Sequence, residues 1–339
     1  MNRKPLIPIA AILVLGMCVV ASFLLTPPAH EKRASPPRPP IAAPSETQGD
    51  VVSVHAPAAP AALAQPAARP KTVRVAAIQC ASPMGKVSRN RQMLSDLITN
   101  AAAQGAKICV LPECALQGYM NPRTDKKWSK EAAPDEGDLA VGVVAETIPG
   151  TSTRHFAELA KQLQIYIALP MIEAADGVFY NSLVLFGPRG EIAAKHRKHA
   201  LWPPGDATWA SEGKGPAAVA ATPYGRLGLM VCYDVHEMPS KLKEARADIV
   251  LYAVGWFGPS EIFFTELFPR RYIVPNGFSV VAANWSGVAG EPEWDGLGYS
   301  CVIDKRGVIL AMAKTTSGAE IVIADLPVGE AGVSEANDE

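Results

Sequence analysis

Short apolar runs alternate with stretches of helical periodicity from residue 71 onward. The apolar runs are continuous rather than alternating, which is typical of strands that are covered on both faces. They cover residues 73–80, 107–111, 165–170, 227–232, 249–254, 279–283, 301–303 and 320–324. Apolar residues at helical spacing predict helices over 89–103, 151–163, 240–245 and 260–273. Because strands and helices interleave along the whole region, the pattern predicts an α/β fold.

A β-hairpin is predicted where the runs 178–186 and 191–195 flank the Gly- and Pro-containing turn 187–190. Alternation along the second strand places His196 and Lys198 on one face and Arg197 on the other. We therefore expect Lys198 to point into the protein. Lys195 is expected only to cover the edge of the sheet.

The first 70 residues differ in composition from the rest of the chain. Arg3 and Lys4 precede an uncharged run, residues 6–25, that is long enough for one membrane-spanning helix. The charge asymmetry predicts a signal anchor over 1–25 that leaves the rest of the chain outside the cytoplasmic membrane. A cleaved signal peptide, cut near Ala21, is the alternative. Residues 26–70, with 11 Pro and 12 Ala, predict a disordered tether. A catalytic domain over 71–328 and a tail over 329–339 follow.

Composition excludes several functional classes. With 32 Lys and Arg against 33 Asp and Glu in 339 residues, the chain has no basic field for binding nucleic acid. The six cysteines are too sparse for a disulfide framework. Neither they nor the six histidines show the spacing of a zinc or redox motif. We therefore expect no metal.

Three reactive side chains stand at the ends of predicted strands, where α/β folds usually place their sites. Glu113 follows an apolar run and Pro112, so partial burial can raise its pKa into the range of a general base. Lys198 lies in a run of basic or titratable residues, 195–199, and Cys232 ends another apolar strand. Such a cysteine is a candidate nucleophile if a nearby cation favours its thiolate.

Each of these residues also has a plainer interpretation. Glu113 can cap a loop, Lys198 can belong to a solvated sheet edge, and Cys232 can be an inert buried thiol. His236, four residues after Cys232, also raises a Cys–His dyad as a competing site.

Taken together, the three segments resemble the nitrilase (carbon–nitrogen hydrolase) superfamily. Leu111-Pro112-Glu113, followed by Gly118-Tyr119, is similar to the superfamily's catalytic glutamate segment. His196-Arg197-Lys198-His199 resembles its Tyr-Arg-Lys-x-His segment, and Val231-Cys232-Tyr233-Asp234 resembles its nucleophile segment. The resemblance covers about 73–327.

The resemblance implies a four-layer α-β-β-α sandwich and a role for each matching residue. Glu113 is expected to be the general base and acid, Lys198 the oxyanion stabiliser and Cys232 the nucleophile. No cofactor is implied, and a homodimer or higher homo-oligomer is expected. Tyr119, Tyr233 and Trp256 are expected to line a substrate pocket. Trp202 and Trp285 are further candidates for this pocket.

The chain departs from the superfamily pattern at one acidic position. Many members carry a second Glu between the Lys and the Cys, where this chain has Asp206. Asp206 is therefore a candidate supporting acid. Otherwise Glu212 serves, or the role is dispensable.

Cys232-Tyr233-Asp234 resembles the amidase and carbamoylase branches more than true nitrilases. The expected activity is hydrolysis of a non-peptide amide-type C–N bond in a small linear substrate, through a cysteine thioester, with release of ammonia or an amine. N-carbamoyl amidohydrolase is the alternative, and nitrilase, N-acyltransferase and a non-catalytic ligand-binding relative are weaker ones.

Overall fold

The structure is a computed structural model of the 339-residue chain, and it describes residues 70–124, 126–131 and 139–328. The expected anchor over 1–25, nearly all of the tether and the tail lie outside the described residues. Within the described ranges, no helix combines the length and apolarity that a membrane crossing requires.

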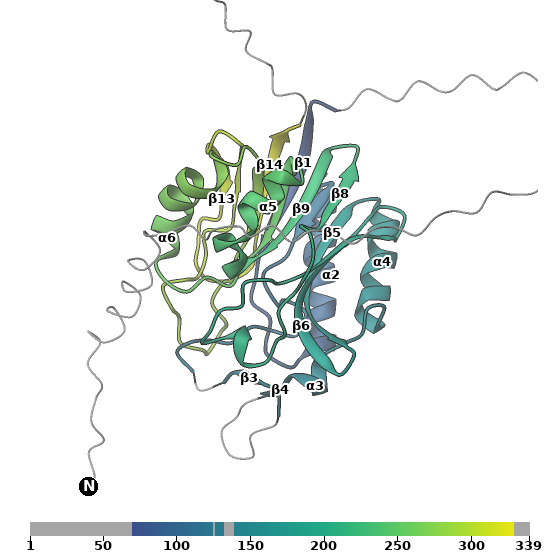
Figure 1. The fold of residues 1–339 in the computed structure, drawn as a ribbon, viewed down its shortest axis with the longest axis vertical. Coiled ribbons are helices and arrows are strands. Elements are labelled where there is room, and N and C mark those ends of the chain that lie inside the picture. The colour runs from purple at the N-terminus through teal and green to yellow at the C-terminus, as the bar shows by residue number, and fades with distance from the viewer. Residues whose placement is uncertain (1–69, 125, 132–138, 329–339) are drawn as a thin grey trace, which may run out of the picture. The chain divides into compact units, whose positions relative to one another are not determined.

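Two six-stranded sheets form the centre of the catalytic unit (Figure 1). The first has the order β14 (Glu320–Pro327), β1 (Thr72–Gln79), β2 (Ile108–Val110), β5 (Tyr166–Ala175), β6 (Val178–Phe186), β7 (Ile192–Arg197). The second has the order β13 (Ile309–Met312), β12 (Cys301–Ile303), β11 (Ser279–Ala283), β10 (Ile249–Ala253), β9 (Gly225–Val231), β8 (Val219–Thr222). Parallel pairing joins β1, β2 and β5 in one sheet and β9, β10 and β11 in the other.

The two sheets pack face to face between two layers of helices. Along β1, Val75 belongs to a core shared with Leu229 and Leu251 of the second sheet, whereas Ala76 and Ile78 belong to the core on the helix side. α2 (Val87–Ala103) and α4 (Thr151–Leu163) cover the outer face of the first sheet and contribute Leu94 and Phe156 to its core. α5 (Met238–Glu244) and α6 (Ser260–Ile262) lie on the opposite side of the molecule (Figure 1). The four-layer arrangement expected from the resemblance is confirmed.

Most predicted elements are present with small differences at their ends. The helix over 151–163 and the strands over 279–283 and 301–303 have the predicted bounds. The single helix predicted over 260–273 is wrong in type. Only Ser260–Ile262 is α-helical, and π-helical turns follow at Phe263–Leu267 and Pro269–Ile273. A proline within this segment removes one backbone donor, which interrupts the regular α-helical ladder.

The short elements were not predicted. These are β3 (Trp128–Ser129), β4 (Leu139–Ala140), α3 (Val141–Val144), β8, β13 and the one-turn 3₁₀ helices Asp206–Thr208 and Cys232–His236. β8 and β13 are the two edge strands of the second sheet and are mostly only half-buried. β8 is a short segment of one valine, two alanines and a threonine, so its sequence signal is weak, whereas β13 lies in the apolar run 308–313, which the prediction did not include.

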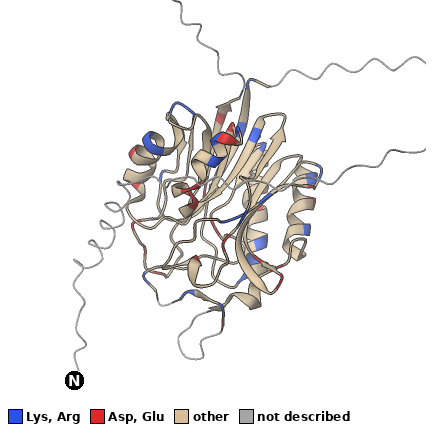
Figure 2. Ribbon diagram, viewed as in Figure 1, with Lys and Arg blue, Asp and Glu red and all other residues tan. Residues whose placement is uncertain are grey.

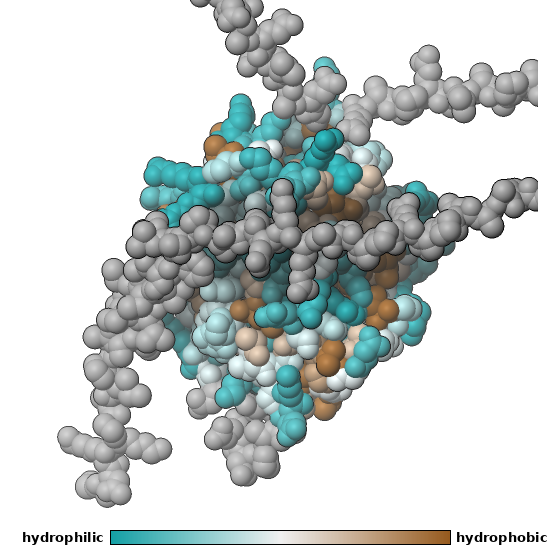
Figure 3. Space-filling view, in the orientation of Figure 1, coloured by the Kyte–Doolittle hydropathy of each residue, from teal (hydrophilic) through white to brown (hydrophobic). Residues whose placement is uncertain are grey.

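Charge and hydropathy are distributed as in an ordinary globular domain. Lys, Arg, Asp and Glu are interspersed on the helices, turns and strand ends, and the central strands carry few of them (Figure 2). The face in Figure 3 is mainly hydrophilic, with scattered apolar residues. All five cysteines among the described residues are buried and unpaired.

One charged cluster on the first sheet corrects the expectation for Lys195. Glu173 on β5 is only 2% exposed and accepts hydrogen bonds from Lys195 Nζ at 2.7 Å, Arg197 Nη2 at 2.7 Å and Ser182 Oγ at 2.6 Å. Lys195 therefore does more than cover the edge, because it neutralises a buried carboxylate. Burial by itself would raise the pKa of Glu173, but the hydrogen bonds from Arg197, Lys195 and Ser182 outweigh it and lower the pKa to about 2.

We predict that Glu173→Gln lowers the free energy of unfolding by about 1–3 kcal/mol at pH 7, because charge-assisted hydrogen bonds are lost. The folded-state pKa of Glu173 is below its ordinary value of 4.5, so its stabilisation is complete above that value and is lost as the pH falls toward 2. Urea unfolding should show a smaller difference from wild type at pH 3.5 than at pH 7. Glu158→Gln, at an exposed helix position, is the control. A difference that stays constant with pH would contradict the prediction.

Candidate active site

The ends of three strands bring the candidate residues to one end of the sandwich. Glu113 follows β2, Lys198 follows β7 and Cys232 follows β9. Their exposures are 0%, 0% and 6%. The Glu113 backbone is tied to the second sheet, because its N–H donates to Val254 O at 3.2 Å and its carbonyl accepts from Trp285 Nε1 at 2.8 Å. Glu113, which follows a strand of the first sheet, is thereby held against the second sheet, whose strand β9 leads into Cys232.

Lys198 lies between two buried carboxylates. Its Nζ is 2.8 Å from Glu113 Oε1 and 3.1 Å from Asp206 Oδ1, both as hydrogen bonds. Asp206 Oδ2 is 3.0 Å from the same nitrogen but lies off the hydrogen-bond direction. Burial lowers the pKa of Lys198, but the charges of Asp206 and Glu113 outweigh it and place the pKa well above the ordinary value. The group therefore stays an ammonium.

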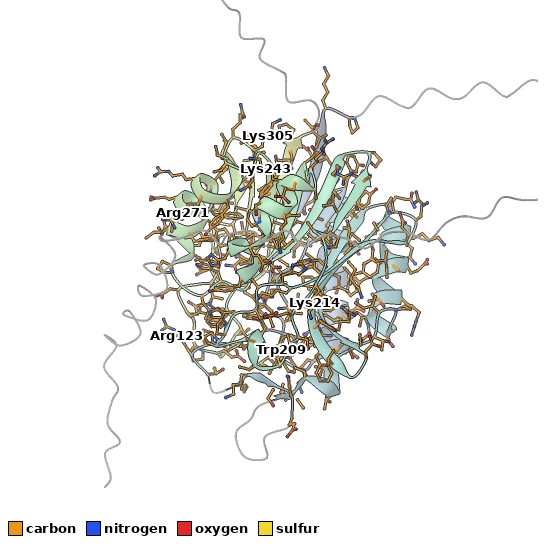
Figure 4. The ribbon with its side chains drawn as sticks, viewed as in Figure 1. Arg123, Trp209, Lys214, Lys243, Arg271 and Lys305 are labelled. Atoms are coloured by element: carbon orange, nitrogen blue, oxygen red, sulfur yellow. The ribbon has the colours of Figure 1, made fainter. Side chains whose placement is uncertain are left out.

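Of the two acids that the sequence left open, Asp206 is the one that lies against Lys198. Its side chain is buried against Lys198, whereas Glu212 is exposed. Asp206 opens the one-turn helix Asp206–Thr208, which contacts β3 and precedes the buried Trp209. Figure 4 labels Trp209 at the end of the molecule where β3 and β4 lie.

The two oxygens of Glu113 have different surroundings. Oε1 accepts hydrogen bonds from Lys198 Nζ and from Asn181 Nδ2, the latter at 2.7 Å. Oε2 is buried and has no hydrogen-bond partner among the described residues. A Cβ added at Gly255 would be 3.0 Å from Oε2, so this oxygen faces Gly255. Burial raises the pKa of Glu113 despite the opposing charge of Lys198, and Oε2 is therefore free to accept a proton.

Cys232 forms a strained turn beside the same glycine. Its φ of +40° is unusual for a residue other than glycine, and its Sγ donates to Gly255 O at 3.3 Å. Tyr252 Oη donates to the Cys232 carbonyl at 2.8 Å, which fixes the turn from the second sheet. Burial, followed by the charge of Glu113, raises the pKa of the Cys232 thiol well above its ordinary value. The resting residue is a thiol that needs a base.

The alternative Cys–His dyad is wrong. In the described structure the His236 ring packs against Tyr233 at 4.6 Å between centroids, and its Nδ1 is 3.5 Å from Tyr272 Oη. Cys232 Sγ instead donates a hydrogen bond to the Gly255 carbonyl. Among the described residues, no group of three or more His, Cys, Asp or Glu side chains is arranged to hold a metal ion.

Of the residues expected to line a pocket, Tyr119 and Trp285 lie beside Glu113, whereas Trp256 packs in the helical layer. A Cβ at Gly255 would lie 2.7 Å from the Tyr119 ring, and that ring packs on Trp285 with centroids 5.7 Å apart. Tyr119 and Trp285 thus adjoin Glu113, and both are almost fully buried. Trp256 stacks on Phe263 at 3.6 Å between centroids, which anchors it in the helical layer.

Two further pocket candidates lie beside other aromatic or histidine rings. Tyr233 packs on His236, while Trp202 packs on Phe257 with centroids 4.0 Å apart. Phe257 also contacts Tyr119, at 6.0 Å between centroids. Trp202 therefore joins the aromatic group next to Glu113 through Phe257.

Sequence reasoning missed Asn181, Tyr252 and Gly255. Asn181 interrupts the apolar strand β6 with a buried amide, which is a usable signal for a polar partner. Tyr252 and Gly255 carry no such signal, because a strand tyrosine and a loop glycine are ordinary residues.

Comparison with known proteins identifies the family of the chain. Residues 74–334 match the carbon-nitrogen hydrolase family. The chain is 32% identical over 267 residues to the omega-amidase NIT2 of Bos taurus, which covers 75% of this chain and 88% of that protein. The human omega-amidase NIT2 is also 32% identical, over 251 residues that cover 70% of this chain and 83% of that protein.

Solved structures show the same fold. A cysteine-to-alanine mutant of the Nesterenkonia AN1 amidase from the nitrilase superfamily superposes with a TM-score of 0.63 at 22% identity, covering 75% of this chain and 90% of that one. Nit3 of Saccharomyces cerevisiae gives a TM-score of 0.60, also at 22% identity, over 76% of this chain and 90% of that one. On the family match and the identity to the omega-amidases, the chain belongs to the carbon–nitrogen hydrolase family, the nitrilase superfamily, on its amidase-like branch.

Proposed function

We propose that this enzyme hydrolyses a small linear amide through a thioester on Cys232, with release of ammonia or an amine. The observation that carries the proposal is the buried Oε2 of Glu113, which has no hydrogen-bond partner among the described residues and can therefore accept a proton from Cys232. Cys232 Sγ and Glu113 Oε2 both face Gly255.

Acylation begins with proton transfer from Cys232 Sγ to Glu113 Oε2. The sulfur attacks the amide carbon, and the carbonyl electron pair moves to oxygen. Lys198 Nζ and the backbone N–H after Cys232 stabilise this oxyanion. When the C–N bond breaks, Glu113 returns the proton to the leaving nitrogen.

Deacylation uses the same groups in reverse roles. Glu113 takes a proton from water, the resulting hydroxide attacks the thioester carbon, and the C–S bond breaks. The thiolate recovers the proton, so that the enzyme returns to its resting state. Throughout, Lys198 keeps its charge because Asp206 compensates it on the side away from the reaction.

Relatives support both the chemistry and the size of the substrate. Another structure of the Nesterenkonia amidase contains the acetamide moiety of fluoroacetamide on its active-site cysteine, and two others contain acrylamide and butyramide. In this chain, Tyr119 and Trp285 limit the space beside Glu113. An assay of ammonia release over simple amides and N-carbamoyl compounds tests the amidase and separates it from the carbamoylase.

We further propose that the catalytic domain acts outside the cytoplasmic membrane, because Arg3 and Lys4 precede the apolar run 6–25. A reporter fused after Glu339 that works only in the exported compartment should be active. High activity from a reporter that works only in the cytoplasm would contradict this orientation.

Cys232→Ala should abolish hydrolysis and leave the melting temperature nearly unchanged, because the substitution removes the nucleophile and little packing volume. Intact-protein mass should show an acyl adduct on the wild type and none on the variant. Cys109→Ala is the matched control, since this buried thiol lies on β2 and has a pKa raised by burial to about 12. Residual turnover above about 1% of wild type would point to another nucleophile such as Cys114.

Lys198→Met should lower the rate by about 100-fold or more, the scale for loss of one preorganised donor. Lys198→Arg should be nearly as harmful, because a planar guanidinium cannot occupy the place of an ammonium held by Glu113 and Asp206. Lys195→Met should reduce thermal stability through Glu173 but keep the rate per folded enzyme. Equal rate losses at Lys195 and Lys198 would refute the assigned role.

A further inference from the structure

Asp234 is a buried carboxylate that the proposed reaction does not use. It lies two residues after Cys232, in the one-turn helix that the nucleophile begins, and its exposure is 0%. A buried carboxylate is retained only where hydrogen bonds and charge compensate its desolvation. The partners of Asp234 show what it holds together.

One carboxylate oxygen holds the loop that carries Lys198. Asp234 Oδ1 accepts the backbone N–H groups of His199 and Ala200, each at 2.9 Å. These are the two residues directly after Lys198. The loop continues into Asp206, whose Oδ1 accepts the backbone N–H of Trp202 at 3.1 Å. The backbone on the C-terminal side of Lys198 is thus tied to two buried carboxylates.

The other oxygen holds the nucleophile turn. Asp234 Oδ2 accepts the Val231 N–H at 3.1 Å, which closes the turn around Cys232. The same oxygen is 2.7 Å from His196 Nε2, on the last strand before Lys198. Asp234 therefore contacts the chain on both sides of Lys198 and on the strand that presents Cys232.

We propose that Asp234 is a positioning residue that sets the placement of Lys198 Nζ relative to Cys232 Sγ. This inference rests on the proposed function, because it assigns Lys198 and Cys232 to one reaction. The physical need is clear: Lys198 reaches the site on a flexible four-carbon stem, and Cys232 stands in a strained turn. A single rigid carboxylate that binds both backbones removes their relative freedom.

Asp234 remains ionised in this position. Burial raises its pKa, but His196 and the backbone N–H of Ala200 outweigh burial, and the net pKa lies below the ordinary value. The carboxylate can then accept from all four donors at once. An asparagine in the same place keeps one oxygen but presents an N–H₂ group where an acceptor is needed.

The test is the variant Asp234→Asn. Two properties are measured: kcat and KM for an amide that the wild type cleaves, and the rate of Cys232 alkylation by iodoacetamide. The alkylation is monitored by intact-protein mass. We expect kcat to fall by about 10- to 100-fold, because small misplacements of reacting groups have effects of this size. KM should change by less than about threefold, since Asp234 is fully buried and both of its oxygens are occupied by protein donors. Alkylation should also slow.

Asp304→Asn is the matched control. Asp304 is also buried, at 3% exposure, and accepts the backbone N–H groups of Arg306 and Val308 in the turn between β12 and β13. Its loss should lower the melting temperature without changing kcat or the alkylation rate. Asp234→Ala should lower kcat further than Asp234→Asn, because no acceptor remains. If Asp234→Ala does not fold, Asp234→Asn decides alone.

Failure of the inference about Asp234 and failure of the proposed function give different results. If Asp234→Asn lowers only the melting temperature and keeps kcat and the alkylation rate within about twofold of wild type, Asp234 is merely structural and the inference is overturned. If the wild type forms no acyl adduct on Cys232 with any amide, the proposed function fails instead. In that case the alkylation rates of Asp234→Asn and Asp304→Asn still decide whether Asp234 positions Cys232.

Discussion

The buried ammonium of Lys198 is the interaction on which the site depends. An ion removed from water costs several kcal/mol unless other charges and hydrogen bonds compensate it. Here Glu113 and Asp206 supply that compensation from two directions. Because Lys198 occupies Oε1 of Glu113, together with Asn181, only Oε2 remains for proton transfer. The same pairing therefore stabilises the site and leaves Oε2 as the oxygen that the proposed mechanism uses as the base.

The two-sheet sandwich makes this arrangement possible. Glu113 and Lys198 come from the first sheet, whereas Cys232 comes from the second. Gly255 lies between the two sheets at this site. Its carbonyl accepts a hydrogen bond from the Cys232 thiol, and its Cα faces Glu113 and Tyr119. Any side chain there would meet the Tyr119 ring and the Glu113 carboxylate, so the close approach of the two sheets requires glycine.

The basic run 195–198 contributes its side chains to two different parts of the protein. Lys195 and Arg197 neutralise Glu173 on the half-exposed side of β7, while His196 and Lys198 enter the protein. Strand alternation predicts this division, but not that the outer pair would neutralise a buried carboxylate. That carboxylate is 22 residues before Lys195, on a strand that pairs with β6 rather than with β7.

The sequence by itself determined the α/β class and most of the long elements, because hydrophobic periodicity is a local property. The three candidate residues came from strand-end motifs whose types and order resemble those of the nitrilase superfamily. The edge positions of β8 and β13, the π-helical turns and the acid that accompanies Lys198 needed tertiary structure. So did the roles of Asn181, Tyr252 and Asp234. Each of these depends on contacts between segments far apart in the chain, and only packing decides which polar group meets which. Asp234 and Asp304 are both aspartates near a strand end. Only the fold places Asp234 against the loop that follows Lys198 and Asp304 in the turn between β12 and β13.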